Sequence, residues 1–145
     1  MDPVYLLDVN VLVALLLAEH EHHDRASRWF KRLPNPRWAT CPMTQAGFLR
    51  LASNAFVTFS PHSPGEAIHL LADNLKDSNH IFWPTHLGYR EATAPFSHKL
   101  TGHRQVTDAY LLGLAMNKKA KLATMDWGIG ALLPPEEAST WIAQI

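Results

Sequence analysis

Short runs of apolar residues alternate along the chain with longer segments in which apolar residues recur every three or four positions. The first run, residues 5–7, ends at Asp8, and the apolar segment after it continues too far for a strand. Buried strands are usually four to eight residues long, whereas helices need ten or more. The pattern therefore predicts a buried strand, a tight turn at Asp8 and a helix that begins near Asn10.

The rest of the chain repeats this alternation. Strands are predicted at residues 38–40, 81–83 and 121–124, with a last edge strand at residues 139–142. Helices are predicted over residues 22–33, 44–54, 64–75 and 108–118, with Ser63 and Thr107 as N-caps of the last two. The irregular stretch 86–105 is expected to contain one short helix. Strands alternating with helices indicate an α/β fold, an α/β/α sandwich with a four- to five-stranded parallel sheet flanked by helices.

Composition narrows the class of protein. The chain has 145 residues, of which 47% are apolar and 18% charged, as expected for a single globular domain spanning residues 1–145. Thirteen acidic residues balance thirteen basic ones, which excludes binding to nucleic acid through bulk positive charge but leaves room for a local basic surface.

Cellular location is inferred from cysteine usage and from the N-terminal segment. Cys41 is the only cysteine, so an intrachain disulfide is impossible and a reducing compartment is expected. Asp2 and Asp8 do not suit a signal peptide, and the apolar stretch at residues 5–17 is too short to span a bilayer. The sequence therefore predicts a cytoplasmic protein with no membrane association.

Three aspartates occupy comparable positions in the predicted elements. Asp8 and Asp126 each follow a predicted strand, and Asp108 opens a predicted helix. Taken singly, each has an ordinary explanation as a helix cap, a turn residue or a first-turn acid. In open parallel sheets, however, ligands bind outside the carboxyl ends of the strands. Three carboxylates at that edge would repel one another unless a cation lay between them, and their hard oxygen ligands suit Mg²⁺ or Mn²⁺.

Four segments of the chain extend this interpretation to a family. YLLDVNVLVALL, ATCPMTQAGFLRLASN, GHRQVTDAYLLGLA and LATMD occur in the order found in PIN-domain ribonucleases of the VapC toxin type, which the chain resembles over essentially its whole length. The resemblance implies a PIN-like fold and a Mg²⁺- or Mn²⁺-dependent endoribonuclease, the toxin of a toxin–antitoxin pair. It also implies products with a 5′-phosphate and a 3′-hydroxyl, a small antitoxin protein as partner, and a homodimer.

Individual site residues follow from the same resemblance. Asp8, Asp108 and Asp126 match the metal-binding acids of the family, and Thr124 matches a small polar position just before the last acid. The family usually places a further acid in the helix after the second strand, where this chain has Gln45 and Gly47. Gln45 is the candidate to replace that acid in the catalytic site by hydrogen-bonding to a metal-bound water. A neutral amide would hold a second metal ion more weakly than a carboxylate does.

Contacts with an RNA substrate require local cations. His103 and Arg104 are the first candidates, because they lie just before Asp108, and Lys99 and Arg50 come next. For Arg50 an ion pair with the acids is an equal alternative, and His103 is also placed to donate a proton to a leaving oxygen.

Other polar and aromatic positions are given supporting or structural roles. Asn10, Thr107 and Thr124 are expected to cap helices or to hydrogen-bond to the acids. The segment EHEHHD, residues 19–24, is interpreted as a solvated turn between two helices rather than a metal site. Trp127 could stack on an RNA base, but packing against the protein is the simpler expectation.

Two other functions are compatible with parts of the pattern. A haloacid-dehalogenase-type phosphatase would also place an aspartate after the first strand, but it requires a second acid where this chain has Asn10. A catalytically weakened PIN fold could serve as an RNA- or partner-binding module, and Gln45 and Gly47 are the residues that favour it. Metal-dependent cleavage of RNA distinguishes these alternatives.

Overall fold

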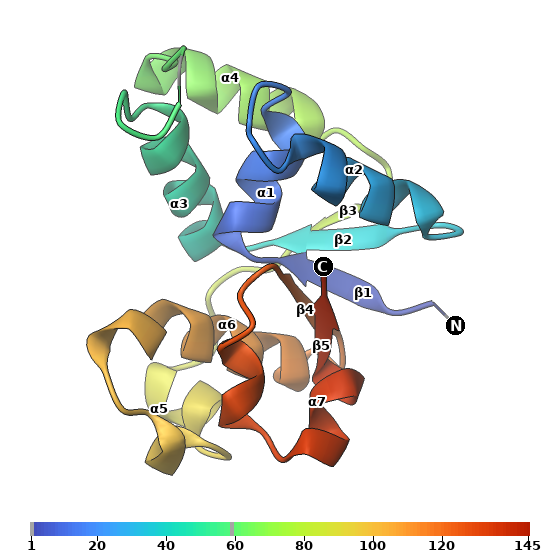
Figure 1. The fold of residues 1–145 in the computed structure, drawn as a ribbon, viewed down its shortest axis with the longest axis vertical. Coiled ribbons are helices and arrows are strands. Elements are labelled where there is room, and N and C mark those ends of the chain that lie inside the picture. The colour runs from blue at the N-terminus through green and yellow to red at the C-terminus, as the bar shows by residue number, and fades with distance from the viewer. Residues whose placement is uncertain (1, 59) are drawn as a thin grey trace.

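The computed structural model describes residues 2–58 and 60–145, and these form one five-stranded sheet covered by helices on both faces (Figure 1). The strands are β1 (Val4–Leu7), β2 (Arg37–Thr40), β3 (His80–Phe82), β4 (Lys121–Thr124) and β5 (Ile142–Gln144). All adjacent strands are parallel, and their order across the sheet is β3-β2-β1-β4-β5. The predicted α/β/α sandwich with a parallel sheet is thereby confirmed.

The N-terminal helices cover one face of the sheet. They are α1 (Val9–Leu16), α2 (His23–Arg32), α3 (Pro42–Ala52) and α4 (Pro64–Asn74). Their apolar side chains pack with Leu7 and Trp38 in one hydrophobic cluster. Helix α4 begins as predicted, because the Ser63 side chain accepts a hydrogen bond from the backbone N–H of Glu66 and Pro64 occupies the first turn.

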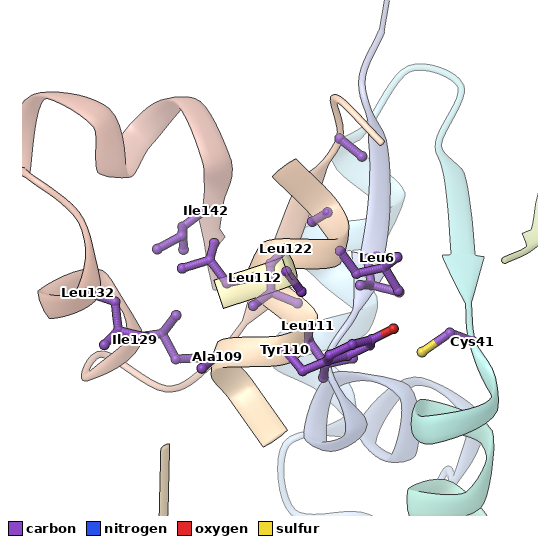
Figure 2. Packing of buried hydrophobic residues seen from close by; sticks show 14 of the residues in the cluster. Leu6, Cys41, Ala109, Tyr110, Leu111, Leu112, Leu122, Ile129, Leu132 and Ile142 are labelled. Carbon is purple, nitrogen blue, oxygen red and sulfur yellow. The ribbon is translucent and has the colours of Figure 1, made fainter. Parts of the chain in front are cut away.

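The C-terminal helices cover the opposite face. They are α5 (Tyr89–Thr93), α6 (Val106–Asn117) and α7 (Pro135–Trp141), together with the short 3₁₀ helices Ser97–Lys99, His103–Gln105 and Ile129–Leu132. Figure 2 shows the core of this face, where Leu111 and Leu112 of α6 lie near Leu6 and Leu122 of the sheet. None of the helices in the described part of the chain is both long and apolar enough to cross a membrane.

Several predicted boundaries differ from the structure. The helix predicted at residues 44–54 is α3 (Pro42–Ala52), and the strand predicted at residues 81–83 is β3 (His80–Phe82). Residues 139–141 belong to α7, and the edge strand is Ile142–Gln144 instead. Pro135 at the start of α7, followed by Glu136 and Glu137 in its first turn, favours a helix over the strand propensity of the residues that follow. Helix α6 begins at Val106, so Gln105 rather than Thr107 occupies its N-cap position.

Candidate active site

Asp8 and Asp126 lie where the order of the strands reverses. The chain adds β2 and β3 on one side of β1, then crosses the sheet and adds β4 and β5 on the other side. Asp8 directly follows β1, its backbone N–H donates to the carbonyl of Ala123 at 3.0 Å, and Asp126 follows β4 by two residues. Such a switch point is the usual location of ligand sites in open parallel sheets.

Asp8 is a buried carboxylate held by two hydrogen bonds. Only 5% of the residue is exposed. Its Oδ1 accepts from the backbone N–H of Val9 at 2.7 Å, and its Oδ2 accepts from Thr124 Oγ1 at 3.0 Å. Burial raises the pKa of Asp8, while these two hydrogen bonds act in the opposite direction. Asp8, the one acid within the first apolar segment, is thus also the N-cap of α1.

Thr124 connects Asp8 to Asp126. The Thr124 hydroxyl is fully buried; it donates to Asp8 and accepts from the backbone N–H of Asp126 at 3.0 Å. Asp126 Oδ1 in turn accepts from the backbone N–H of Gly128 at 2.7 Å. The turn after β4 is therefore oriented by the same side chain that supports the buried acid.

Asp108 contributes the third carboxylate from the first turn of α6. Burial is the main cause that raises its pKa to about 7, and the negative charges of Asp8 and Asp126 add to the effect. A perturbed acid beside two others is typical of a functional site. The structure brings together three acids that are distant in sequence, as the strand pattern predicts.

The donor set fits a divalent cation. Three carboxylates supply hard oxygen ligands, and their mutual repulsion is what a bound cation would relieve. Across residues 2–58 and 60–145, however, no three Asp, Glu, His or Cys side chains are grouped closely enough to hold a metal ion as they stand.

A small cavity adjoins two of the acids. Asp108, Asp126, Arg104 and Gln105 contribute to the lining of this cavity, which measures about 110 Å³. Gln105, which sequence reasoning did not select, orders the preceding turn, since its Oε1 accepts from the backbone N–H groups of Thr101 at 2.7 Å and Gly102 at 3.2 Å. The structure thus places Arg104, a predicted substrate contact, beside the acids.

The Gln45 amide bonds to the end of β2, the strand next to β1. Its Nε2 donates to Thr40 Oγ1 at 3.0 Å, and that hydroxyl lies 2.8 Å from His80 Nε2. These contacts lie between β2 and β3, whereas Asp8 and Thr124 meet between β1 and β4. Gly47 allows α3 to approach α1, because a Cβ there would lie 2.5 Å from a methyl carbon of Val9. Among residues 2–58 and 60–145, the structure records no hydrogen bond between the Gln45 amide and an aspartate.

The remaining predicted residues form no hydrogen bond with the acids that the structure records. His103 and Thr107 are exposed, Lys99 is half-buried, and Arg50 is exposed in the last turn of α3. Within residues 2–58 and 60–145, Arg50 forms no ion pair, so the alternative of an Arg50–acid pair is wrong. Asn10 is exposed in the first turn of α1, where Asp8 already serves as the cap.

Two features were missed or misjudged from sequence. The segment interpreted as a solvated turn contributes His20, Glu21 and His22 to a second cavity that also reaches Asp126. Trp127 is 75% exposed, so the expectation that it packs against the protein is wrong. The cavity has no local sequence signal, since it depends on the segment 20–22 meeting the distant Asp126.

Comparison with known proteins shows which family the sequence resembles. The PIN domain family model matches residues 5–132. Ribonuclease VapC29 from Mycobacterium tuberculosis is 41% identical over 127 residues, covering 88% of this chain and 89% of the relative. Ribonuclease VapC44 from the same species is 36% identical over 140 residues, covering 97% and 98%.

Solved structures share the fold at low sequence identity. The crystal structure of Mycobacterium tuberculosis VapC20, a Sarcin-Ricin loop cleaving toxin, aligns with a TM-score of 0.64 at 15% identity and covers 88% of this chain and 93% of that one. FitAcB from Neisseria gonorrhoeae aligns with a TM-score of 0.61 at 18% identity and covers 95% of both chains. With three aspartates at the switch point of a parallel sheet and a family model that spans most of its length, this chain belongs to the PIN domain family.

Proposed function

We propose that this protein is an endoribonuclease of the VapC toxin type that hydrolyses phosphodiester bonds of RNA with Mg²⁺ or Mn²⁺ as cofactor. The observation that carries the proposal is the meeting of Asp8, Asp108 and Asp126 at the switch point, where burial and mutual repulsion raise the pKa of Asp108 to about 7. Relatives at 36–41% identity are named ribonucleases, which supports the same activity here.

The three aspartates would hold the cation, and a different part of the chain supports each of them. Asp8 is fixed by the N-terminus of α1 and by Thr124, Asp126 by the turn after β4, and Asp108 by the first turn of α6. When bound, the divalent cation would supply electrostatic stabilisation of the phosphate and activation of a water molecule. These supports place the three carboxylates near one edge of the sheet, and their side chains would draw together when a cation binds.

Arg104 is proposed to bind the RNA backbone. It lines the cavity that contains Asp108 and Asp126, and it contributes a positive charge beside these two acids. A guanidinium at this position would bind a phosphate oxygen and orient the strand across the acids. His103 and Lys99, from the adjoining turns, are proposed to extend this contact.

The partners are proposed from the family. A small antitoxin protein would block the acidic edge, and two copies of the chain would form a homodimer. The exposed apolar side chains of Phe56 and Val57, in the loop after α3, are compatible with a protein contact. The proposed site of action is the cytoplasm.

Incubating the purified protein with RNA tests the function. The proposal predicts cleavage in Mg²⁺ or Mn²⁺, no cleavage in EDTA, and products that carry a 5′-phosphate. Asp73→Asn, which changes an exposed acid on α4, should cleave like the wild type. Cleavage that persists in EDTA would contradict metal dependence, whereas RNA binding without cleavage by a folded protein would favour the alternative of a binding module.

A further inference from the structure

Asp126 also lines a second cavity, which is distinct from the cavity that contains Asp108. Met125 and Asp126 of the turn after β4 contribute one wall, and Asn10, His20, Glu21 and Arg25 contribute the rest together with His22. Its volume is about 370 Å³. Pockets that hold small organic ligands usually measure about 300–1,000 Å³. The cavity is therefore large enough for a planar ring system beside the acids.

The loop that lines this cavity is ordered by its own hydrogen bonds. The backbone N–H of His22 donates to His20 Nδ1 at 3.0 Å, so the neutral His20 ring carries its proton on Nε2. Burial lowers the pKa of His20, which favours this neutral form. Arg25 is anchored separately, because its guanidinium donates to the carbonyl oxygen of Ile145. His20 and Arg25 are thus held in place within the lining by hydrogen bonds.

The charges in the cavity favour a neutral ligand over a phosphate. Arg25 is positive, but Glu21 and Asp126 are both negative, so a further anion would be repelled. The Glu21 carboxylate also lies 3.4 Å from His22 Nε2. A nucleobase is neutral and carries donors and acceptors on its edges. Asn10 offers both kinds of group, His20 offers a donor and Glu21 offers acceptors.

The position of the second cavity relative to the acids indicates which base of the RNA would enter it. Asp126 lines both this cavity and the cavity that contains Asp108 and Arg104. We propose that the second cavity receives the nucleobase adjoining the cleaved phosphate and so determines the RNA sequence that is cut. This proposal rests on the proposed endoribonuclease function. Unpaired RNA bases are commonly recognised through their edges, with arginine planes or apolar atoms packed on their faces, roles that Arg25 and Met125 can supply.

The test compares four single-stranded RNAs that differ only in the base adjoining the cleaved bond. The kcat/KM of each is measured for the wild type and for two variants, Asn10→Ala and Glu21→Gln. Both replaced side chains are exposed, so folding should be preserved. The ratio of kcat/KM between the best and worst RNA should fall by about fivefold or more in Asn10→Ala, and Glu21→Gln should change the preferred base. His69→Gln, an exposed histidine on α4, is the matched control and should keep the wild-type ratios.

The possible outcomes separate this proposal from the function on which it rests. If the wild type cleaves all four RNAs equally, or if both variants keep the wild-type ratios, the cavity does not read the base although the endoribonuclease function stands. An equal loss of kcat/KM for all four RNAs in Asn10→Ala would also overturn base recognition, because it indicates a general effect on catalysis. Absence of cleavage by the folded wild type would overturn the proposed function itself.

Discussion

The hydroxyl of Thr124 donates to Oδ2 of Asp8 at 3.0 Å, although 115 residues separate the two along the chain. Both residues are buried and lie at the ends of the neighbouring parallel strands β4 and β1. The same hydroxyl accepts the backbone N–H of Asp126, so one side chain fixes two of the three acids. The site therefore depends on the register between β1 and β4.

Thr124→Val tests the contribution of this hydroxyl to stability. The variant keeps the shape of the side chain but leaves a buried carboxylate oxygen of Asp8 without its donor. We expect the free energy of unfolding to fall by about 1–3 kcal/mol, measured by chemical denaturation near neutral pH. Thr124→Ser retains the hydroxyl and is the control. Equal stability of the Val and Ser variants would show that the hydrogen bond contributes little.

The raised pKa of Asp108 predicts how stability depends on pH without metal. The folded pKa is about 7 and the unfolded value is 3.8, so between these two pH values the folded state binds a proton that the unfolded state has lost. Stability contributed by protonated Asp108 is therefore fully present below about pH 4 and is lost as the pH rises to about 7.

Asp108→Asn removes this dependence. In EDTA we expect the variant to be more stable than the wild type by about 1–2 kcal/mol above pH 7, allowing for solvent screening of a partly exposed carboxylate, and nearly equal at pH 4. Denaturation curves across this pH range provide the measurement. Added Mg²⁺ should stabilise the wild type and not the variant, because it binds the ionised acids. Identical pH profiles for both proteins would contradict the assigned environment of Asp108.

Gln45→Ala tests whether Gln45 takes part in catalysis. Because its amide is bonded to Thr40 between β2 and β3, we expect the rate of RNA cleavage to change by less than about threefold and the free energy of unfolding to fall by about 1 kcal/mol. A loss of cleavage as large as that in an aspartate variant would instead place Gln45 in the catalytic site.

Arg104→Ala tests the proposed contact with the RNA backbone. Loss of one phosphate contact should raise KM more than it lowers kcat, and should reduce the dependence of log KM on log salt concentration by about 0.7 per contact for single-stranded RNA. Lys76→Ala is the control. It removes an exposed positive charge that follows α4 and is paired with Asp73. Unchanged KM and salt dependence would exclude Arg104 from the substrate contact.

The sequence predicts those parts of the fold that local patterns determine. Strand β1, the acid at its end and the cap at Ser63 follow from short-range periodicity and capping chemistry, and the structure confirms them. The last strand was misplaced because aromatic and β-branched residues at the end of α7 have strand propensity, while the proline and acids at its start favour a helix. The residue types of Thr107 and Asn10 suit helix caps, but Gln105 and Asp8 occupy the N-cap positions of α6 and α1.

The parts of the site that the sequence does not predict depend on contacts between distant segments. The Gln45 amide bonds to Thr40, whose hydroxyl lies close to His80 across the β2–β3 pair, and no spacing within α3 indicates this contact. The loop at residues 20–22, between α1 and α2, lines one cavity with Asp126, which follows β4. The sequence of this loop by itself indicates only a polar turn.

The most direct test of the central claim is the rate of metal-dependent RNA cleavage by Asp8→Asn, Asp108→Asn and Asp126→Asn, measured in parallel with Asp73→Asn. If the three acids form one site, each of the first three substitutions should lower the rate by about 100-fold or more, while the Asp73 variant keeps the wild-type rate. Folding of every variant is checked by denaturation under the same conditions. Cleavage at the wild-type rate by any of the three folded site variants would contradict the assignment of that aspartate, and cleavage by all three would place the active site elsewhere.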